Sequence, residues 1–377
     1  MARRLNSAQA GFETEFAALL AERRDGPSGN AAKVAEIIAD VRARGDAALV
    51  EYTARFDGLD LSAAELRLKP GEIAAAAAQC PAETRAALAF AANRIEDFHQ
   101  RQMPADLDYT DASGVRLGAR WGALAAAGLY VPGGTAAYPS SVLMNAIPAK
   151  VAGVARIVMV VPTPGGALNP AVMAAAEIAG LDEIYRIGGA QAVAALAYGS
   201  ATIAPVDKIV GPGNEWVAEA KRQVFGTVGI DMIAGPSEIL VVADGANNPE
   251  WIAADLLSQA EHDSAAQAIL ICDDAGFADS VAAAVEKILE TLPRRDIAGE
   301  SWRRHGAIIL VGSLDDAPAL VDRIAPEHLE LAVAEPEALF ARVTHAGAVF
   351  LGRHTPEAVG DYVAGPNHVL PTSGSAR

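Results

Sequence analysis

Cysteine is nearly absent from this sequence. The 377 residues include only Cys80 and Cys272, which form no Cys-x-x-Cys pair. This usage excludes a disulfide framework and favours a reducing compartment, so we expect a cytoplasmic protein. We interpret both cysteines as small core residues.

Basic charge and long apolar runs are also scarce. Lys and Arg number 30 against 47 Asp and Glu, which gives a formal net charge of −17. A field of this sign repels nucleic acids and anionic membranes. Residues 1–6 lack a following apolar segment, and no run reaches the roughly 18 apolar residues of a membrane span. We expect a soluble protein that acts on a small molecule, with no nucleic-acid or membrane partner.

The length and the pattern of the chain predict an α/β fold. A chain of 377 residues exceeds one ordinary core, and domains usually hold roughly 100–200 residues. Short β-branched runs alternate with alanine-rich helical stretches, with strands expected at 156–161, 184–187 and 208–210. This alternation is typical of parallel sheets covered on both faces. We predict two Rossmann-like domains with parallel-rich sheets covered by helices, plus an N-terminal helical arm.

Glycine-rich passages suggest where the domains divide. We predict a helical arm at 1–25 and an inserted α/β domain at 130–239. The segments 26–129 and 240–377 would together form the other, discontinuous α/β domain.

Residues 30–100 are expected to be mainly helical. Apolar residues recur with helical spacing in 31–44 and in 82–101. These two stretches are therefore predicted to be long amphipathic helices.

A small set of polar residues carries the predicted chemistry. Glu327 and His328 are adjacent and offer proton acceptors with ordinary pKa values of roughly 4.3 and 6.5. Gln259 and His262, three apart on a predicted helix, would project from one face. With the distant Asp361 they form a mixed N/O set of the kind that zinc accepts. We predict a metal-dependent enzyme that performs acid/base chemistry, with His368 further downstream.

Glycine turns after predicted strands leave cofactor binding open. Gly188-Gly189 and the stretch 211–214 would place helix N-termini where an anion could bind. The dinucleotide fingerprint G-x-G-x-x-G, followed by an acid about twenty residues later, is absent. Tight αβ connections explain these glycines at least as well as NAD binding does.

Several long motifs together resemble the histidinol dehydrogenase family. The likeness covers the chain in order from about residue 25. The motifs are Gly128–Gly134, Ile187–Ala192, Val210–Asn214, Ile230–Ala243, Gln259–Asp263, Pro326–Glu330, Gly360–Tyr362 and Gly365–His368.

The resemblance implies a cytoplasmic homodimeric zinc enzyme with shared active sites, which ends histidine biosynthesis. Such an enzyme oxidises L-histidinol through L-histidinaldehyde to L-histidine with two NAD⁺. The residue roles carried over are metal ligation by Gln259, His262 and Asp361, catalysis by Glu327 and His328, NAD binding by Tyr130, Gln191 and Asn214, and substrate binding by Ser237, Gln259, His262, His328, Asp361 and His368. The inserted domain would then bind NAD, and the discontinuous domain would carry the metal and the catalytic residues.

The resemblance also implies separate roles for the two catalytic residues, and the sequence departs from the family pattern at its C-terminal end. His328 would accept a proton in each hydride step, and Glu327 would help water add to the aldehyde. Family members typically continue beyond Pro371-Thr372, with a tail that supplies a further zinc-binding His and a substrate-binding Glu to the partner subunit. This sequence ends at Arg377, so we expect weaker zinc binding than in a chain with the tail.

Three alternatives remain open at this point. The nearest is a zinc and NAD dehydrogenase of the same family that oxidises another small alcohol, such as a sulfonated diol. Another is a binding protein that keeps the fold without turnover. The third is a zinc hydrolase without a nucleotide, which would leave the glycine turns unexplained.

Overall fold

The computed structural model describes residues 2–22, 29–133, 138–233 and 235–377. The chain forms two compact units. The first comprises Met1–Pro27, Ala234–Gly360 and Leu370–Arg377, and the second comprises Ser28–Ile233 and Asp361–Val369. Among the described residues, no helix combines the length and apolarity needed to cross a membrane.

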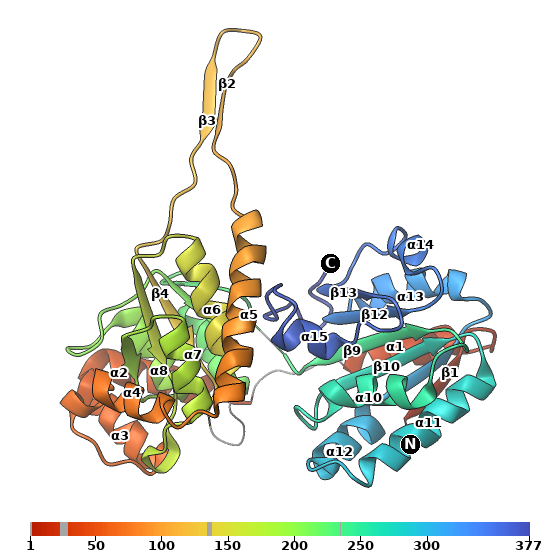
Figure 1. Ribbon diagram of the computed structural model, residues 1–377, viewed down its shortest axis with the longest axis horizontal. Helices are drawn as coiled ribbons and strands as arrows, with labels where there is room; N and C mark the ends of the chain where they lie inside the picture. Colours follow the sequence, from red (N-terminus) through yellow and green to blue (C-terminus); the bar gives the residue numbers. More distant parts are fainter. Residues whose placement is uncertain (1, 23–28, 134–137, 234) are drawn as a thin grey trace. The chain divides into compact units, whose positions relative to one another are not determined.

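The first unit is built on a six-stranded parallel sheet (Figure 1). In spatial order its strands are β1 (Arg3–Asn6), β11 (Ala307–Leu310), β10 (Gln267–Cys272), β9 (Glu238–Ala243), β12 (His328–Ala332) and β13 (Ala348–Leu351). The central strands are almost continuously apolar, as expected for strands buried on both faces.

Helices cover both faces of this sheet. One face packs against α10 (Pro249–Ala260), α11 (Ala275–Leu289) and α12 (Arg295–His305). The other packs against α1 (Phe12–Glu22) and α13 (Ala317–Ile324). The remaining helical segments are η3 (Leu314–Asp316), α14 (Pro336–Phe340) and α15 (Glu357–Tyr362), and the last two residues of α15 belong to the second unit.

The second unit has a five-stranded parallel sheet. Its spatial order is β6 (Glu183–Tyr185), β5 (Arg156–Val160), β4 (Ala126–Tyr130), β7 (Lys208–Val210) and β8 (Gly229–Ile230). One face packs against α2 (Ala31–Arg44), α3 (Asp46–Asp57), α8 (Gly189–Tyr198) and α9 (Glu215–Val224). The other packs against α4 (Pro70–Ala77), α5 (Ala82–Arg101), α6 (Pro139–Val151) and α7 (Pro170–Ile178). Two short 3₁₀ segments complete this unit, η1 (Ala63–Glu65) and η2 (Pro164–Gly166).

Both sheets wind in the same way. In the second sheet, and among strands β9 to β13 of the first, the earliest strand is central, the next two lie on one side and the following two lie on the other, while β1 extends the edge of the first sheet. This 3-2-1-4-5 order is the Rossmann-like arrangement, so the predicted fold class is confirmed.

The N-terminal segment differs from the predicted helical arm. Residues 3–6 form β1, which pairs in parallel with β11 and extends the first sheet, and only α1 is helical. Leu5 is buried in the sheet, which explains why this segment does not form a separate arm. The predicted boundary at residue 25 lies outside the described residues.

The division of the chain also differs from the prediction for 26–129. The described residues 29–129 belong to the second unit, because the apolar faces of α2 and α5 pack on its sheet. Residues 235–239 belong to the first unit, because Glu238 begins β9. Segment 361–369 joins the second unit, where Asn367 Nδ2 donates to the Met144 carbonyl at 2.6 Å.

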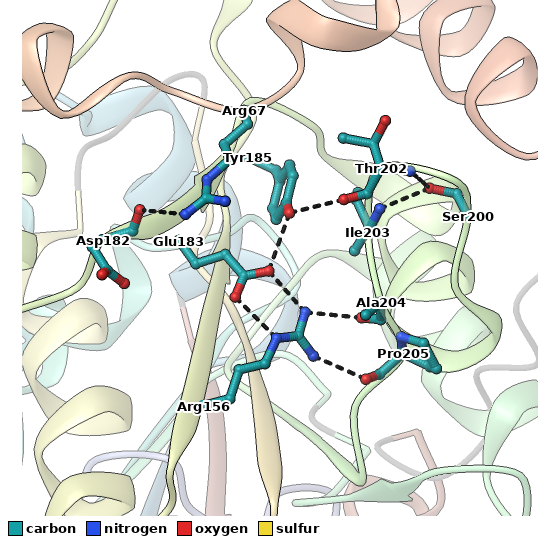
Figure 2. Close-up of polar contacts among 10 residues, drawn as sticks. All are labelled: Arg67, Arg156, Asp182, Glu183, Tyr185, Ser200, Thr202, Ile203, Ala204 and Pro205. Atoms are coloured by element: carbon teal, nitrogen blue, oxygen red, sulfur yellow. Dashed lines mark hydrogen bonds and ion pairs between the residues drawn. The ribbon is translucent and has the colours of Figure 1, made fainter.

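A polar cluster at the amino end of the second sheet joins two strands to a loop (Figure 2). Arg156 on β5 donates two hydrogen bonds to Glu183 on β6, at 2.9 and 2.8 Å. The same guanidinium donates to the carbonyls of Ala204 and Pro205, each at 3.0 Å. Arg156 therefore fixes the loop between α8 and β7 to the sheet.

A two-stranded antiparallel hairpin extends from the second unit (Figure 1). It consists of β2 (Leu107–Thr110) and β3 (Arg116–Ala119), and every residue of both strands is exposed. No pattern in the sequence predicted this hairpin.

Candidate active site

Glu327 and His328 are held by one residue at the amino end of the first sheet. The backbone N–H of Glu238, where β9 begins, donates to Glu327 Oε2 at 2.9 Å. The carbonyl oxygen of the same residue lies 2.9 Å from His328 Nδ1. The two side chains are themselves close, with Glu327 Oε2 3.7 Å from His328 Nδ1. The pairing of β9 with β12 therefore lets one residue hold both predicted side chains.

The surroundings of His328 set its protonation state. Burial lowers the pKa of the imidazole, so the ring is neutral near pH 7. A carbonyl oxygen only accepts hydrogen bonds, so the proton of the neutral ring sits on Nδ1. Nε2 is then the basic nitrogen, which is the state that a general base requires.

Glu357 is a site residue that the sequence analysis missed. Its Oε1 lies 3.7 Å from His328 Nε2, and the side chain is only 1% exposed. Its Oε2 accepts a hydrogen bond from Ser258 Oγ at 2.9 Å. A single glutamate at the start of a short helix carries no spacing signal, and only the fold brings it to His328.

Two further carboxyl groups lie behind Glu357. Glu330 Oε1 accepts a hydrogen bond from the Glu357 backbone N–H at 2.5 Å. Burial and the neighbouring Asp255 raise the pKa of Glu330 well above its usual value. Burial likewise raises the pKa of Asp255 to about 6. Close carboxyl groups in a buried place retain protons to higher pH, because each charge disfavours the next.

Gln259 and His262 lie near the carboxyl end of α10. Gln259 is 1% exposed within the helix, whereas His262 follows the last helical residue, Ala260. The prediction that both sit on one helix is therefore wrong for His262, which is in the turn where α10 ends. Its backbone N–H donates to the Gln259 carbonyl at 3.1 Å, and this bond keeps the two residues together.

The imidazole of His262 is suited to ligation. Burial lowers the pKa of His262, so the ring is neutral near pH 7 and has a free lone pair. The charge of Glu357 acts on both His262 and His328, and the charge of His262 acts on His328. These three side chains therefore gather at one edge of the first unit.

Ser237 immediately precedes Glu238 and is half-buried. Its carbonyl accepts from the Gln267 N–H at 2.9 Å, which aligns this loop with β10. Ser237 thus lies beside the residue that holds Glu327 and His328.

Asp361 and His368 belong to the second unit. Asp361 follows Glu357 by four residues on α15, so the helix places both carboxylates on one face. His368 Nδ1 lies 3.0 Å from the Asp361 carbonyl oxygen. The ligand role of Asp361 and the substrate role of His368 stay predictions.

The residues predicted to bind NAD gather at the carboxyl edge of the second sheet. Tyr130 ends β4, and Asn214 caps α9 after β7 by accepting from the N–H groups of Trp216 and Val217. The chain reverses its winding direction between β4 and β7, and ligands of such sheets bind at this switch point. Gln191 lies in the first turn of α8 and is 2% exposed.

Glycines allow the backbone at this edge to approach closely. Gly211 has φ 116°, and a Cβ atom there would lie 2.1 Å from the Tyr130 carbonyl oxygen. Its N–H donates to Asp231 Oδ2 at 2.7 Å, and the buried Lys221 pairs with the same carboxylate. The loop between β7 and α9 is therefore rigidly held.

One unit thus carries a neutral buried imidazole among carboxyl groups, and the other carries a nucleotide-type switch point. Together they place the protein in the class of α/β dehydrogenases. Similarity to known proteins gives the family. The sequence profile of histidinol dehydrogenase matches residues 22–377.

Individual relatives agree with the profile. Histidinol dehydrogenase of Rhodospirillum rubrum is 69% identical over 375 residues, which are 99% of this chain and 86% of that protein. The enzyme of the same name from Ruegeria pomeroyi is 67% identical over 374 residues, again 99% and 86% of the two chains. The crystal structure of histidinol dehydrogenase from Elizabethkingia anophelis matches with a TM-score of 0.94 at 37% identity, covering 100% of this chain and 86% of that one. This chain belongs to the histidinol dehydrogenase family, and it is an oxidoreductase of histidine biosynthesis.

Proposed function

We propose that this protein oxidises L-histidinol to L-histidine with NAD⁺ as the hydride acceptor and zinc as the metal. The observation that carries the proposal is the state of His328. Its Nδ1 faces a carbonyl oxygen 2.9 Å away, burial keeps the ring neutral, and Nε2 is left as a base. Alcohol oxidation needs such a base, because a proton must leave the hydroxyl as a hydride leaves the carbon.

The four-electron reaction divides into three steps. In the first, His328 Nε2 takes the hydroxyl proton while hydride passes to NAD⁺, which gives the aldehyde. In the second, Glu327 accepts a proton from water as the water oxygen adds to the aldehyde carbon, and His328 returns its proton to the carbonyl oxygen, which gives the hydrate. In the third, the hydrate gives a hydroxyl proton to His328 and a hydride to a second NAD⁺, which gives the acid.

Glu357 suits the step in which His328 becomes an imidazolium. Its carboxylate lies 3.7 Å from the nitrogen that accepts the proton, so it stabilises the positive charge. The imidazolium must release this proton before the second hydride step. The carboxyl groups of Glu330 and Asp255 lie behind Glu357, and burial raises the pKa of both.

The residues present suit a zinc ion. Gln259 supplies an amide oxygen, His262 a neutral imidazole, and Asp361 a carboxylate, which are donors that zinc accepts. The buried Glu357 Oε1 receives no hydrogen bond from the part of the chain that the structure describes, which favours a cation nearby. When bound, zinc would orient the imidazole and amino groups of the substrate, with Ser237 and His368 lining the pocket.

The switch point of the second sheet supports NAD binding. Tyr130 and Gln191 border the N-terminus of α8, and Asn214 caps α9. The partial positive charge of helix N-termini favours a pyrophosphate, even in a protein with a net charge of −17.

A homodimer in the cytoplasm is part of the same proposal, and the hairpin β2–β3 supports it. Leu107, Tyr109 and Leu117 are 54%, 47% and 42% exposed. A two-stranded hairpin is marginally stable by itself, so a second copy of the chain is expected to cover these side chains.

The activity test uses the purified chain with L-histidinol and NAD⁺. NADH should form, stop when a chelator removes zinc, and resume when zinc is added back. A simple sulfonated diol serves as the comparison substrate. If the zinc-loaded protein forms no NADH from L-histidinol, the proposal is contradicted, whatever the rate with the other alcohol.

A further inference from the structure

In the second unit, the strand beside the first strand does not end in the acidic residue that dinucleotide-binding sheets ordinarily have there. In those sheets an acidic residue at the end of the strand beside the first strand binds the ribose hydroxyls. Here the first strand is β4 and that neighbour is β5, which ends at Val160. Val161, Pro162 and Thr163 follow, and none of them is acidic.

Asp57 brings a carboxylate to this place from another part of the chain. It is the last residue of α3, which packs against η2, the segment directly after Thr163. A Cβ atom on Gly166 in η2 would lie 3.3 Å from Leu59 Cδ1, so the chain after Asp57 also contacts this segment.

Asp57 is also near the end of β4. Burial raises the pKa of Tyr130 to about 12, and the nearby charge of Asp57 contributes to the rise. Asp57 therefore lies beside the ends of both strands, where the missing acid would be.

Among the described residues, three side chains around this place have buried polar atoms without a hydrogen-bond partner. They are Asp57 Oδ2, Thr163 Oγ1 and Gln191 Oε1. Thr163 and Gln191 are each only 2% exposed. Native proteins rarely leave such atoms without a hydrogen bond. Three of them in one place indicate a ligand that supplies hydrogen-bond donors.

Local contacts bring these atoms to the N-terminus of α8. A Cβ atom on Gly189 would lie 2.7 Å from Gln191 Oε1, and the Gly189 N–H donates to the Tyr130 hydroxyl at 3.0 Å. A Cβ atom on Gly188 would lie 2.6 Å from Pro162, the neighbour of Thr163.

We propose that Asp57 binds the 2′ and 3′ hydroxyls of a nucleotide ribose, with Thr163 and Gln191 as supporting contacts, and thereby selects NAD⁺ over NADP⁺. This inference rests on the proposed dehydrogenase function. The two hydroxyls of a vicinal diol can each donate a hydrogen bond to one carboxylate. This suits a site whose buried acceptor atoms have no donor. A 2′-phosphate would instead bring a second negative charge against Asp57, and partial burial strengthens that repulsion.

The test compares Asp57→Asn with Asp60→Asn, an exposed aspartate three residues further on. The equilibrium affinity for NAD⁺ and the steady-state constants for NAD⁺ and NADP⁺ are measured with zinc-loaded protein. Asp57→Asn should weaken NAD⁺ binding and raise its KM about ten- to hundredfold, the loss expected for hydrogen bonds to a charged group. The ratio of kcat/KM for NADP⁺ to that for NAD⁺ should rise at least about tenfold, since the repulsion is also removed. Asp60→Asn should resemble the wild type.

Thr163→Val provides a second variant, in case Asp57→Asn does not fold. It keeps the side-chain shape and should raise the KM for NAD⁺ with little change in kcat. Unchanged NAD⁺ affinity and an unchanged cofactor ratio in folded Asp57→Asn would overturn this inference alone. Unchanged KM in Thr163→Val would do the same if that variant is the one that folds. Wild-type protein that neither binds nor reduces NAD⁺ would overturn the proposed function as well.

Discussion

His328 and Glu327 differ in chemistry because Glu238 presents a different backbone group to each. An N–H at 2.9 Å holds the Glu327 carboxylate, and a carbonyl at 2.9 Å fixes the tautomer of His328. The same strand end therefore holds both of the proposed proton acceptors.

Glu327→Gln should separate the two oxidation steps. The amide keeps the shape but cannot accept a proton, so aldehyde oxidation should fall about 10²- to 10⁴-fold. Alcohol oxidation should fall much less. Each half-reaction is measured alone, by NADH formed from L-histidinol or from L-histidinaldehyde, with the exposed Glu335→Gln as control. Equal losses in both halves would refute the assigned duty of Glu327.

The activity should extend to unusually low pH for a histidine base. Only neutral His328 accepts a proton, and burial lowers its pKa below the ordinary value of about 6.5. The acid limb of kcat/KM for L-histidinol at saturating zinc should therefore lie below about pH 6.5. The free energy of unfolding should also decrease as pH falls below this value, since the unfolded chain binds the proton more readily. An acid limb above pH 6.5 would show that another group titrates.

At the residue scale, the sequence predicted the adjacent pair and the Gln-His spacing but not the buried acids. Glu330 and Glu357 are single acidic residues, and nothing in their sequence spacing marks them. Their role depends on β12 and α15 meeting in space, which local sequence does not encode.

At the scale of elements, periodicity was sufficient for helices that bury one face. The predicted ranges 31–44 and 82–101 coincide with α2 and α5. The hairpin β2–β3 has exposed residues on both sides, so the in-out alternation that reveals a half-buried strand is missing. His262 was assigned to a helix because three-residue spacing does not show where the helix ends.

Arg156→Met tests the polar cluster that joins β5, β6 and the loop before β7. It would leave Glu183, whose side chain is 16% exposed, without its cation, and two loop carbonyls without their donor. Because the pair is partly screened, we expect a loss of about 1–3 kcal/mol in the free energy of unfolding. Urea unfolding at pH 7 measures it.

Arg101→Met is the matched control for this measurement. Arg101 pairs with Asp97 four residues earlier, but both side chains are exposed, at 74% and 65%. Water solvates both ions after the change, so no measurable loss is expected. A similar effect of the two substitutions would show that the cluster does not stabilise the fold.

At the scale of the whole molecule, the sequence predicted two Rossmann-like sheets but not which helices cover which sheet. An amphipathic helix shows that one face is buried, not what buries it, so 26–129 was assigned to the wrong sheet. Each unit is built from segments that are far apart in the sequence. The local sequence pattern does not show which distant segments pack together.

The hairpin gives a prediction for assembly. Leu117→Glu would place a charge among its exposed apolar residues, and should shift the protein from dimer to monomer in sedimentation equilibrium. Every residue of β3 is exposed, so the fold should be retained. Monomeric wild-type protein, or a variant as dimeric as the wild type, would contradict the assigned interface.

The central claim is a four-electron oxidation by one active site, and its most direct test is stoichiometry. A known amount of L-histidinol is consumed with excess NAD⁺ and zinc, and the NADH and the organic product are quantified together. The account predicts two NADH per L-histidinol and L-histidine as the product. One NADH with released aldehyde, or no NADH at all, would contradict it.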